Sequence, residues 1–410
     1  MTIPEKNILG IFSPSTIEIE KSPEELIKEA LVHPIKAGRL SHQVRDKKKI
    51  LIIVDDQTRM TPVPIILPYL LDELGEGRSD SPEITFLIGL GTHQPMDEEA
   101  IVRKMGKEIA SRYPVMNHAW WDPAQLTFIG ETDSHIPIFV NKLARDADFI
   151  IGIGQIVPHR VSGFSGGGNI VQPGICGEET TGKTHWLAAQ FSGREILGKV
   201  ENPVKQEIEK VALRAGLAWI MNCILDGSGR LASVVSGDPV EAYRVGASLS
   251  FDIYRSDLPR EADIVITDSH PYDSELWVAS KGIYAAELAV RQGGIVILVS
   301  PCTEGVSTSH SEVLETGYHP YSVVEEIVRQ GKISKLTAAA HLVHVGRVVK
   351  ERAQGILVTK GISRQETEKL GLTYAATPQE ALDIALDRLG SKAQVAVFRQ
   401  GGDILPVIDK

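Results

Sequence analysis

Three polar motifs carry the residue types of an active site, and each follows a short apolar run of the sequence. Asp55, Asp56 and Arg59 follow the first run. His93 follows the second run, and His159 follows the third. Imidazoles and carboxylates transfer protons near neutral pH, and a guanidinium holds a carboxylate through two parallel hydrogen bonds. Because ligands of open α/β sheets bind at the carboxyl ends of strands, the three motifs predict a site.

A glycine-rich stretch, Gly163–Asn169, comes directly after the third motif, and Pro173, Gly174 and His185 follow it. Each signal has a structural explanation. A lone histidine after a strand is usually a hydrogen-bonded turn residue, an acid pair is usually a turn or a helix cap, and a glycine run is often a flexible loop. Their arrival on consecutive strand ends favours a site over these separate explanations.

Gly177–Thr184 matches the phosphate-binding pattern G-x-x-x-x-G-K-[ST]. Three features argue against a P-loop. Glu178 and Glu179 would repel the phosphates, Pro173 and Gly174 interrupt the strand that should precede the loop, and the apolar strand ending in Asp55 lies upstream of the loop instead of downstream. A P-loop-type ATP-dependent phosphotransferase or ATPase stays open as the alternative function.

The apolar runs predict the fold class. They are rich in Ile and Val and do not alternate with polar residues, which is typical of strands covered on both faces of a parallel sheet. The runs are Ile50–Val54, Ile84–Ile88, Phe149–Ile153, Ile264–Ile266, Ile295–Val299, Ile356–Val358 and Val395–Phe398.

Helix starts lie between these runs. Ser22, Asn202, Asp238 and Thr377 are each followed by proline, which is typical of an N-cap and the first helical position. Strands alternating with helices predict an α/β protein with mainly parallel sheets flanked by helices. We expect two such domains, with the active site at the domain interface.

The charged, proline-containing segment Tyr254–Glu261 is the best domain boundary. The sequence therefore predicts an N-terminal α/β domain over residues 1–255 and a C-terminal α/β domain over 262–392. Residues 394–410 have strand character after a complete helix, and we expect them to complete the sheet of the N-terminal domain.

Composition excludes several classes. The 410 residues carry 43 basic and 53 acidic side chains, a formal charge of −10, which argues against nucleic-acid or membrane-surface binding. The three cysteines are too scattered for a disulfide framework, which fits a reducing cytoplasm. No apolar run approaches the roughly 20 residues of a membrane span. The sequence does not predict the oligomeric state.

The ordered motifs resemble those of the nickel-dependent lactate racemase family of 2-hydroxyacid racemases and epimerases. The resemblance covers about residues 50–305 in order and approximate spacing, and it is carried by Asp55–Pro62, Gly91–His93, Pro158-His159, Ser165–Gly168, Pro173-Gly174, His185 and Lys281-Gly282.

The resemblance implies a nickel pincer nucleotide, which is a pyridinium mononucleotide that holds nickel through carbon and two sulfurs. One histidine completes the square-planar nickel, a geometry that suits soft sulfur and imidazole donors, and by position this ligand is His185. Asp56 matches an acid near the reacting centre that orients a histidine or the cofactor. Backbone N–H groups of the glycine-rich stretch would bind the cofactor phosphate. The implied cofactor-binding residues there are Ser165, Gly166, Gly167, Gly168 and Asn169.

The implied reaction moves a hydride from the hydroxyl-bearing carbon to the cofactor and back to the other face of a transient 2-oxoacid. His93 and His159 match the family's pair of acid/base residues at the two hydroxyl positions. Arg59 and Lys281 match the residues that hold the substrate carboxylate. The substrate implied is a small-molecule 2-hydroxyacid.

The sequence departs from the family pattern at several positions. Asn169 stands where the best-known members carry a lysine that forms a thioamide bond with the cofactor, so we expect non-covalent binding or, as a further alternative, a non-catalytic cofactor-binding protein. Trp277 and Val278 replace a tyrosine–glutamine pair before Lys281, and Arg160 adds a cation, so the substrate predicted is larger than lactate. His341 and His344 lie near the place of a late tryptophan; a helix face explains both.

Overall fold

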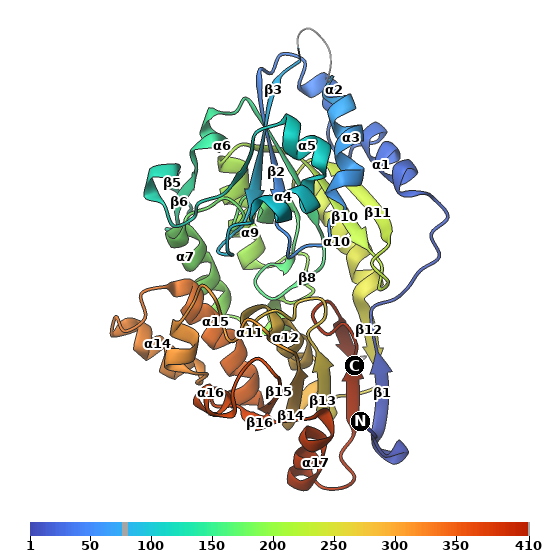
Figure 1. Ribbon diagram of the computed structural model, residues 1–410, viewed down its shortest axis with the longest axis vertical. Helices are drawn as coiled ribbons and strands as arrows, with labels where there is room; N and C mark the ends of the chain where they lie inside the picture. Colours follow the sequence, from blue (N-terminus) through green and yellow to red (C-terminus); the bar gives the residue numbers. More distant parts are fainter. Residues whose placement is uncertain (76–80, 409–410) are drawn as a thin grey trace. The chain divides into compact units, whose positions relative to one another are not determined.

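The computed structural model describes residues 1–75 and 81–408 and divides the chain into two compact units (Figure 1). The N-terminal unit contains residues 16–184 and 199–252. The C-terminal unit contains residues 1–15, 185–198 and 253–410. Helices α7 (Glu178–Ala189) and α10 (Glu241–Tyr254) cross the division between the units.

The N-terminal unit is built on a six-stranded sheet in the order β11-β10-β7-β2-β3-β4, in which only the β10–β11 pair is antiparallel. Its strands are β2 (Lys49–Asp55), β3 (Glu83–Gly89), β4 (Val115–Asn117), β5 (Leu126–Glu131), β6 (Pro137–Asn141), β7 (Phe149–Gln155), β8 (Pro158–His159), β9 (Gly163–Phe164), β10 (Leu217–Leu225) and β11 (Leu231–Gly237). Its other helices are α1 (Pro23–Val32), α2 (Leu40–Gln43), α3 (Val63–Glu73), α4 (Glu98–Met105), α5 (Lys107–Arg112), α6 (Lys142–Asp146) and α9 (Pro203–Arg214), with short 3₁₀ turns η2 (Pro123–Gln125) and η3 (Gly167–Ile170).

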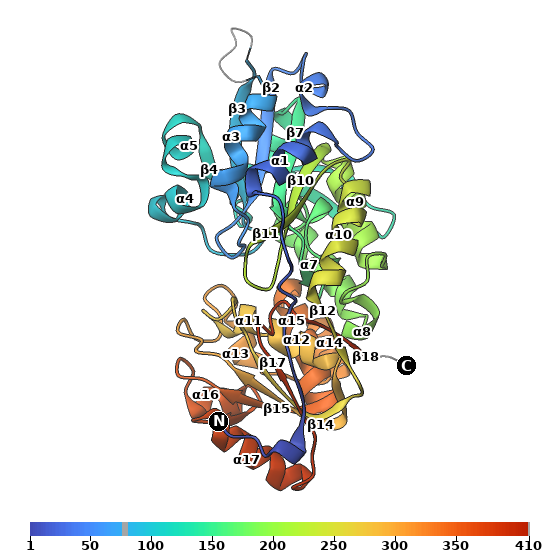
Figure 2. The same ribbon diagram turned by 90° about the vertical axis from the view of Figure 1, so that its right-hand side faces the viewer.

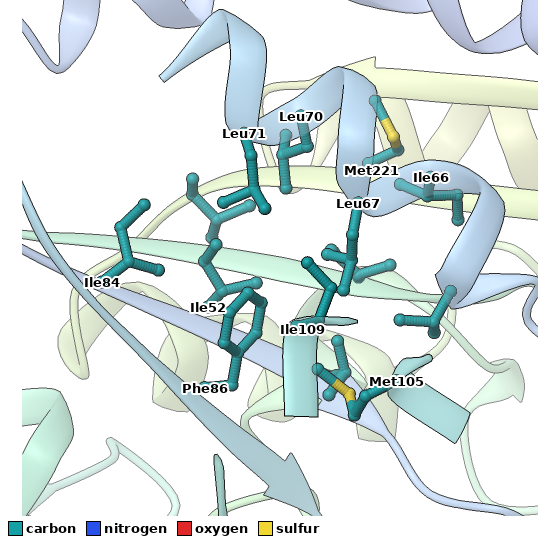
Figure 3. Packing of buried hydrophobic residues seen from close by; sticks show 14 of the residues in the cluster. Ile52, Ile66, Leu67, Leu70, Leu71, Ile84, Phe86, Met105, Ile109 and Met221 are labelled. Carbon is teal, nitrogen blue, oxygen red and sulfur yellow. The ribbon is translucent and has the colours of Figure 1, made fainter. Parts of the chain in front are cut away.

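Both faces of this sheet are buried, as the unbroken apolar runs predict. Alternate residues of β2, such as Ile52, pack against α3 in a single core (Figure 3). The intervening residues Leu51 and Ile53 point to the other face and are only 2% and 0% exposed. Figure 2 shows α3, α4 and α5 on one side of the sheet and α9 and α10 on the other. This layering leaves the ends of the strands as the place for polar side chains.

The C-terminal unit has a parallel six-stranded sheet in the order β1-β17-β13-β14-β15-β16. Its strands are β1 (Ile8–Phe12), β12 (Arg255–Leu258), β13 (Ala262–Asp268), β14 (Val290–Val299), β15 (Ala353–Val358), β16 (Thr373–Ala375), β17 (Val395–Phe398) and β18 (Leu405–Ile408). Its helices are η1 (Glu5–Asn7), α8 (Gly193–Ile196), α11 (Leu276–Ala279), α12 (Lys281–Glu287), α13 (Glu312–Thr316), α14 (Tyr321–Arg329), α15 (Leu336–Gly346), the π-helical segment η4 (Arg347–Arg352), α16 (Arg364–Lys369) and α17 (Pro378–Leu389).

The predicted α/β class, with mainly parallel sheets flanked by helices, is therefore confirmed. Helices α1, α9 and α17 begin at the predicted prolines, whereas α10 begins at Glu241, two residues after Pro239. Side chains at all four positions accept hydrogen bonds from backbone N–H groups of the first helical turn, as N-caps do. No helix in the described parts of the chain is long and apolar enough to cross a membrane.

The division into domains differs from the prediction at both ends of the chain. Strand β17 pairs with β13 and β1, and β18 pairs with β12, so residues 394–410 belong with the C-terminal sheet and do not complete the N-terminal one. Residues 1–15 also belong to the C-terminal unit, because β1 pairs with β17 and the Asn7 side chain donates to Ser391 O and Ala393 O. The chain therefore begins and ends in the same unit.

Candidate functional site

The three predicted motifs emerge from adjacent strands of the N-terminal sheet. Strand β2 lies between β7 and β3, and the carboxyl ends of these three parallel strands lie at one edge of the sheet. Asp56 and Arg59 follow β2, His93 follows β3, and His159 follows β7. The structure thus brings the predicted acid, arginine and both histidines of this unit to one edge.

Asp56 and His93 form a short hydrogen bond, with 2.6 Å between Asp56 Oδ2 and His93 Nδ1. The other carboxylate oxygen accepts from the backbone N–H of Thr58 at 2.9 Å and from its hydroxyl. Burial raises the pKa of Asp56, but the His93 charge and hydrogen bond, the Thr58 hydroxyl and the Arg59 charge outweigh burial and hold the pKa well below its usual range. The ionised Asp56 therefore accepts the proton on Nδ1 of His93, and in the neutral form of this histidine the lone pair lies on Nε2.

His159 lies on the short β8–β9 hairpin, and its Nδ1 is 3.1 Å from Ser162 Oγ. The single hydroxyl proton of Ser162 is donated to Phe164 O at 2.8 Å, because a carbonyl can only accept. Ser162 Oγ is therefore an acceptor for His159, whose Nδ1 must carry the proton. Both predicted histidines are thus fixed through Nδ1, with Nε2 as the basic nitrogen. The next residue, Arg160, is 4% exposed.

The second acid of the pair has a structural role that the sequence did not predict. Asp55 Oδ1 lies 2.7 Å from Lys104 Nζ of α4, and the two side chains are only 12% and 6% exposed. Asp55 Oδ2 accepts from the Thr61 hydroxyl, while Lys104 also donates to Arg59 O at 3.0 Å. This buried ion pair positions the loop that carries Asp56 and Arg59.

The glycine-rich stretch is buried, and its conformation explains its composition. Gly166 and Gly167 have φ angles of +84° and +56°, in the region that favours glycine. A Cβ on Gly166 would lie 2.5 Å from an Ile156 carbon, and one on Gly167 would lie 2.9 Å from Tyr243. These glycines allow close packing.

Two backbone N–H groups of this stretch do not support its predicted role in phosphate binding, because they already donate hydrogen bonds within the protein. The backbone N–H of Ser165 donates to Val157 O at 2.9 Å, and that of Gly167 donates to Asn222 Oδ1 at 2.8 Å. Both groups are already used within the protein. Gly168 packs against Ala212 and Ile208 of α9.

Asn169 ends the stretch with two side-chain partners. Its Nδ2 lies 3.2 Å from Ser162 Oγ, and its Oδ1 accepts from Lys205 Nζ at 2.8 Å. The sequence did not predict Ser162 or Lys205. Lys205 carries no motif signal, although it lies three residues after the predicted N-cap Asn202 and is 1% exposed.

The match to a phosphate-binding loop is not supported by the local structure. Helix α7 begins at Glu178, so most of Gly177–Thr184 is helical instead of wrapping around a phosphate. Lys183 forms an ion pair with Glu179 at 3.2 Å, and the Thr184 hydroxyl donates to Thr180 O at 2.9 Å. These contacts are those of an ordinary helix. The sequence match to a phosphate-binding loop therefore no longer supports an ATP-dependent function.

His185 lies on α7, directly after the residues of the N-terminal unit, and is half-buried. Among the described residues, no group of three or more His, Cys, Asp or Glu side chains is placed to hold a metal ion. A metal at His185 would therefore take its other ligands from a bound group or from solvent. A cofactor that brings its own metal donors, as the family resemblance implies, would need only this one histidine from the chain.

The remaining predicted site residues belong to the C-terminal unit. Trp277 lies on α11 and Lys281 begins α12 four residues later. Lys281 Nζ is 3.2 Å from the centre of the Tyr272 ring, and the Tyr272 hydroxyl donates to Asp403 at 2.9 Å. The ring is thus fixed, and a cation over its face is favourable.

Trp277 is stacked between two histidines. Its ring centroid lies 4.2 Å from those of His310 and His341, with interplanar angles of 26° and 17°. The two nitrogens of His341 face the hydroxyls of Tyr284 and Tyr318 at 3.2 and 3.3 Å. Burial, with a smaller contribution from His310, lowers the pKa of His341 to about 3, so this ring is uncharged at neutral pH. His341 therefore acts as a rigid neutral support for the indole.

His344, one turn further along α15, is buried and meets the Tyr284 ring edge to face, with centroids 6.1 Å apart. The predicted site residues thus fall into two groups, one in each unit. That the two groups form one active site remains a prediction.

The match to known families supplies the class of protein. Residues 1–195 match the lactate racemase N-terminal domain, and residues 258–405 match the lactate racemase C-terminal domain. The chain belongs to the lactate racemase family. This membership supports a racemase, which is an isomerase, as the activity.

Individual members of the family are similar to this chain over nearly its whole length. The lactate racemase of Thermoanaerobacterium thermosaccharolyticum is 27% identical over 409 residues, covering 98% of this chain and 95% of the relative. That of Lactiplantibacillus plantarum is 28% identical over 414 residues, covering 97% and 95%. The structure of the lactate racemase apoprotein from T. thermosaccharolyticum superposes with a TM-score of 0.88 at 26% identity, covering 100% of this chain and 97% of that one. A Thermotoga maritima protein gives 0.77 at 25% identity, covering 96% and 100%.

The buried Asp55–Lys104 pair predicts a strong dependence of stability on Lys104. Lys104→Met should lower the free energy of unfolding by about 3–5 kcal/mol, because it leaves the Asp55 carboxylate buried without its counter-charge. Arg103→Met, on the same helix, is the matched control, since that side chain is 67% exposed and should change stability by roughly 0.5 kcal/mol or less. Urea unfolding at pH 7 measures both. Equal losses in the two variants would contradict the structural role of the pair.

Proposed function

We propose that the protein racemises or epimerises a 2-hydroxyacid with a nickel pincer nucleotide, using His93 and His159 as its two acid/base groups. The observation that carries this proposal is the matched arrangement of the two imidazoles. Each is held through Nδ1, one by Asp56 and one by Ser162, which makes Nε2 the nitrogen that carries the lone pair of the neutral ring. They emerge from β3 and β7, the two neighbours of β2.

The chemistry requires two such groups. The C–H bond beside a hydroxyl is far too weakly acidic for direct deprotonation near pH 7. When bound, the cofactor supplies reversible hydride acceptance at that carbon. One imidazole removes the hydroxyl proton as the C–H bond is broken, and the other returns a proton to the inverted hydroxyl. An imidazole can perform either role near neutral pH.

The residues around the histidines have supporting roles in this proposal. Arg59 and Lys281 hold the substrate carboxylate, and a guanidinium does so through two parallel bonds. Asp56 orients His93 and fixes its tautomer, in the way that a buried aspartate orients the histidine of a catalytic triad. His185 is the nickel ligand, and Asn169 lies beside the cofactor, where an amide cannot form a thioamide bond.

The substrate we propose is a hydroxyacid larger than lactate. Trp277 is held rigid by the rings on both of its faces, and it lies four residues from Lys281 on consecutive helical turns. Residues four apart share a helix face, so a carboxylate at Lys281 would direct the rest of the substrate toward the indole. Val278 offers no hydrogen bond, and Arg160 adds a second cation.

A panel of 2-hydroxyacids checks the substrate class. We expect kcat/KM to be higher for hydroxyacids with a larger side chain, or with a second acid group, than for lactate. His341→Leu, which removes one support of Trp277, should reduce this preference. Lactate as the best substrate in the panel would contradict the proposed substrate class without affecting the mechanism.

The two histidines should be separable by half-reaction. Either His93→Ala or His159→Ala should abolish full racemisation, while each variant keeps the half-reaction that relies on the surviving histidine. The half-reaction that lost its base should slow by roughly 10²–10⁴-fold. Transient oxoacid formed from each enantiomer is the measurement, and His33→Ala, at an exposed helix end, is the control. Retained racemisation in either variant would remove that histidine from the mechanism.

The cofactor should be held without a covalent bond and through His185. Denaturing mass spectrometry of the loaded protein should give the unmodified mass of the chain, because Asn169 cannot form the thioamide. His185→Ala should lose nickel, measured as metal per chain after gel filtration, together with activity. An adduct of several hundred daltons would contradict the first expectation, and full nickel occupancy in His185→Ala would contradict the second. Cofactor binding without turnover of any hydroxyacid would instead identify a non-catalytic binding protein.

A further inference from the structure

Lys205 is a fully buried cation beside the glycine-rich stretch. Its Nζ donates to Gly166 O at 2.9 Å and to Asn169 Oδ1 at 2.8 Å, and it lies 3.4 Å from the centre of the Tyr243 ring. Burial lowers the pKa of Lys205 to about 7, while the charges of Glu209 and Glu201 act in the opposite direction, so the group is an ammonium cation below about pH 7. Three acceptors thus surround the three N–H donors of this ammonium group.

The ammonium group determines which way the Asn169 amide faces. An ammonium group has no acceptor, so the amide atom 2.8 Å away must be the oxygen. The amide nitrogen therefore points away from Lys205, toward Ser162 Oγ at 3.2 Å. Ser162 can take only an acceptor role here, because its proton goes to Phe164 O.

Asn169 is consequently limited to donating. Among the described residues, Ser162 Oγ is the one acceptor found for Nδ2, and an amide nitrogen carries two hydrogens. The side chain is half-buried, so the second N–H can meet a bound group. An N–H donor with a cation directly behind it suits an anionic acceptor.

The cofactor class in the proposed function suggests which anion would bind beside Asn169. In the proposed cofactor, a thioamide bond to a lysine would take up one acyl group of the pyridinium ring. Without that bond the group would remain an acid, and a carboxylic acid is ionised at neutral pH. A hydrogen-bond donor at the position of Asn169 would suit that anion.

We propose that Lys205 makes Asn169 an obligatory hydrogen-bond donor, and that Asn169 Nδ2 recognises an ionised acyl group on the pyridinium ring of a mononucleotide. This inference rests on the proposed function, because the pyridinium mononucleotide is the cofactor class proposed above. Lys205 acts through Asn169 and is a positioning residue. The pair replaces a covalent link with charge-assisted recognition.

The test compares two pyridinium mononucleotides that differ only at the acyl group. Nicotinic acid mononucleotide carries a ring carboxylate, and nicotinamide mononucleotide carries a neutral amide. Calorimetric titration of the full chain without nickel should show roughly 10- to 100-fold tighter binding of the acid, as a hydrogen bond to a charged group provides.

Three variants separate recognition from folding. Asn169→Asp keeps the size of the side chain and can pair with Lys205, so the protein should stay folded, but it should lose the preference for the acid. Lys205→Met should weaken that preference, because the amide is no longer oriented. Lys210→Met, an exposed lysine on the same helix, should behave as the unaltered protein.

The outcomes are distinct. Equal affinity for the two mononucleotides, or an unchanged preference in a folded Asn169→Asp protein, would overturn this inference and leave the racemase proposal standing. Binding of neither mononucleotide would contradict the cofactor class itself, and this inference would fail with it. Thermal unfolding of each variant confirms that loss of preference is not loss of fold.

Discussion

The geometry of the N-terminal site depends on the buried ion pair between Asp55 and Lys104. Asp55 ends the central strand β2 and is paired with Lys104 from α4, while the Thr61 hydroxyl donates to its second oxygen. A buried charge is stable only when it is paired and hydrogen-bonded, so these contacts leave few positions for the loop between Asp56 and Thr61. Lys104 also holds Arg59 O, which ties the predicted carboxylate-binding arginine to the same pair. The neighbouring Asp56 is then directed at His93.

The features that could be predicted from the sequence are those that depend on neighbouring residues in the chain, namely the buried strands and the helix N-caps. Strands buried on both faces read as unbroken Ile and Val runs, and each predicted run lies within a strand of the structure. N-caps depend on one side chain and the next three residues, so they could be read directly. The partner of a parallel strand is not a local property, and this is why residues 394–410 were assigned to the wrong sheet. Strand β17 is as apolar as a central strand because it is one, between β1 and β13.

The candidate site shows the same contrast between local features, which the sequence predicts, and contacts that depend on the fold. His93 and His159 could be predicted because both follow apolar strands. Ser162 lies only three residues from His159, but its role as an acceptor depends on the bond that it donates to Phe164 O. Lys205 contacts Asn169 from the separate helix α9, which no local pattern indicates. The phosphate-binding pattern at Gly177–Thr184 misleads in the opposite direction. The sequence matches the pattern, but α7 begins at Glu178, so the segment is helical and does not form a phosphate-binding loop. The glycines of the buried stretch are explained by packing against Ile156 and Tyr243 as well as by any ligand.

The pairing of β1 with β17 also sets an order of events during synthesis. In the sheet order, β17 is the one neighbour of β1, with Ile8 opposite Val395. The ribosome makes β1 long before β17, because most of the described chain lies between them and translation proceeds at roughly 5–20 residues per second. Residues 16–252 are complete long before then and include every strand of the N-terminal sheet. Strand β1 therefore cannot form its parallel pairing with β17 until Val395–Phe398 have been made, by which time the strands of the N-terminal sheet have all been synthesised.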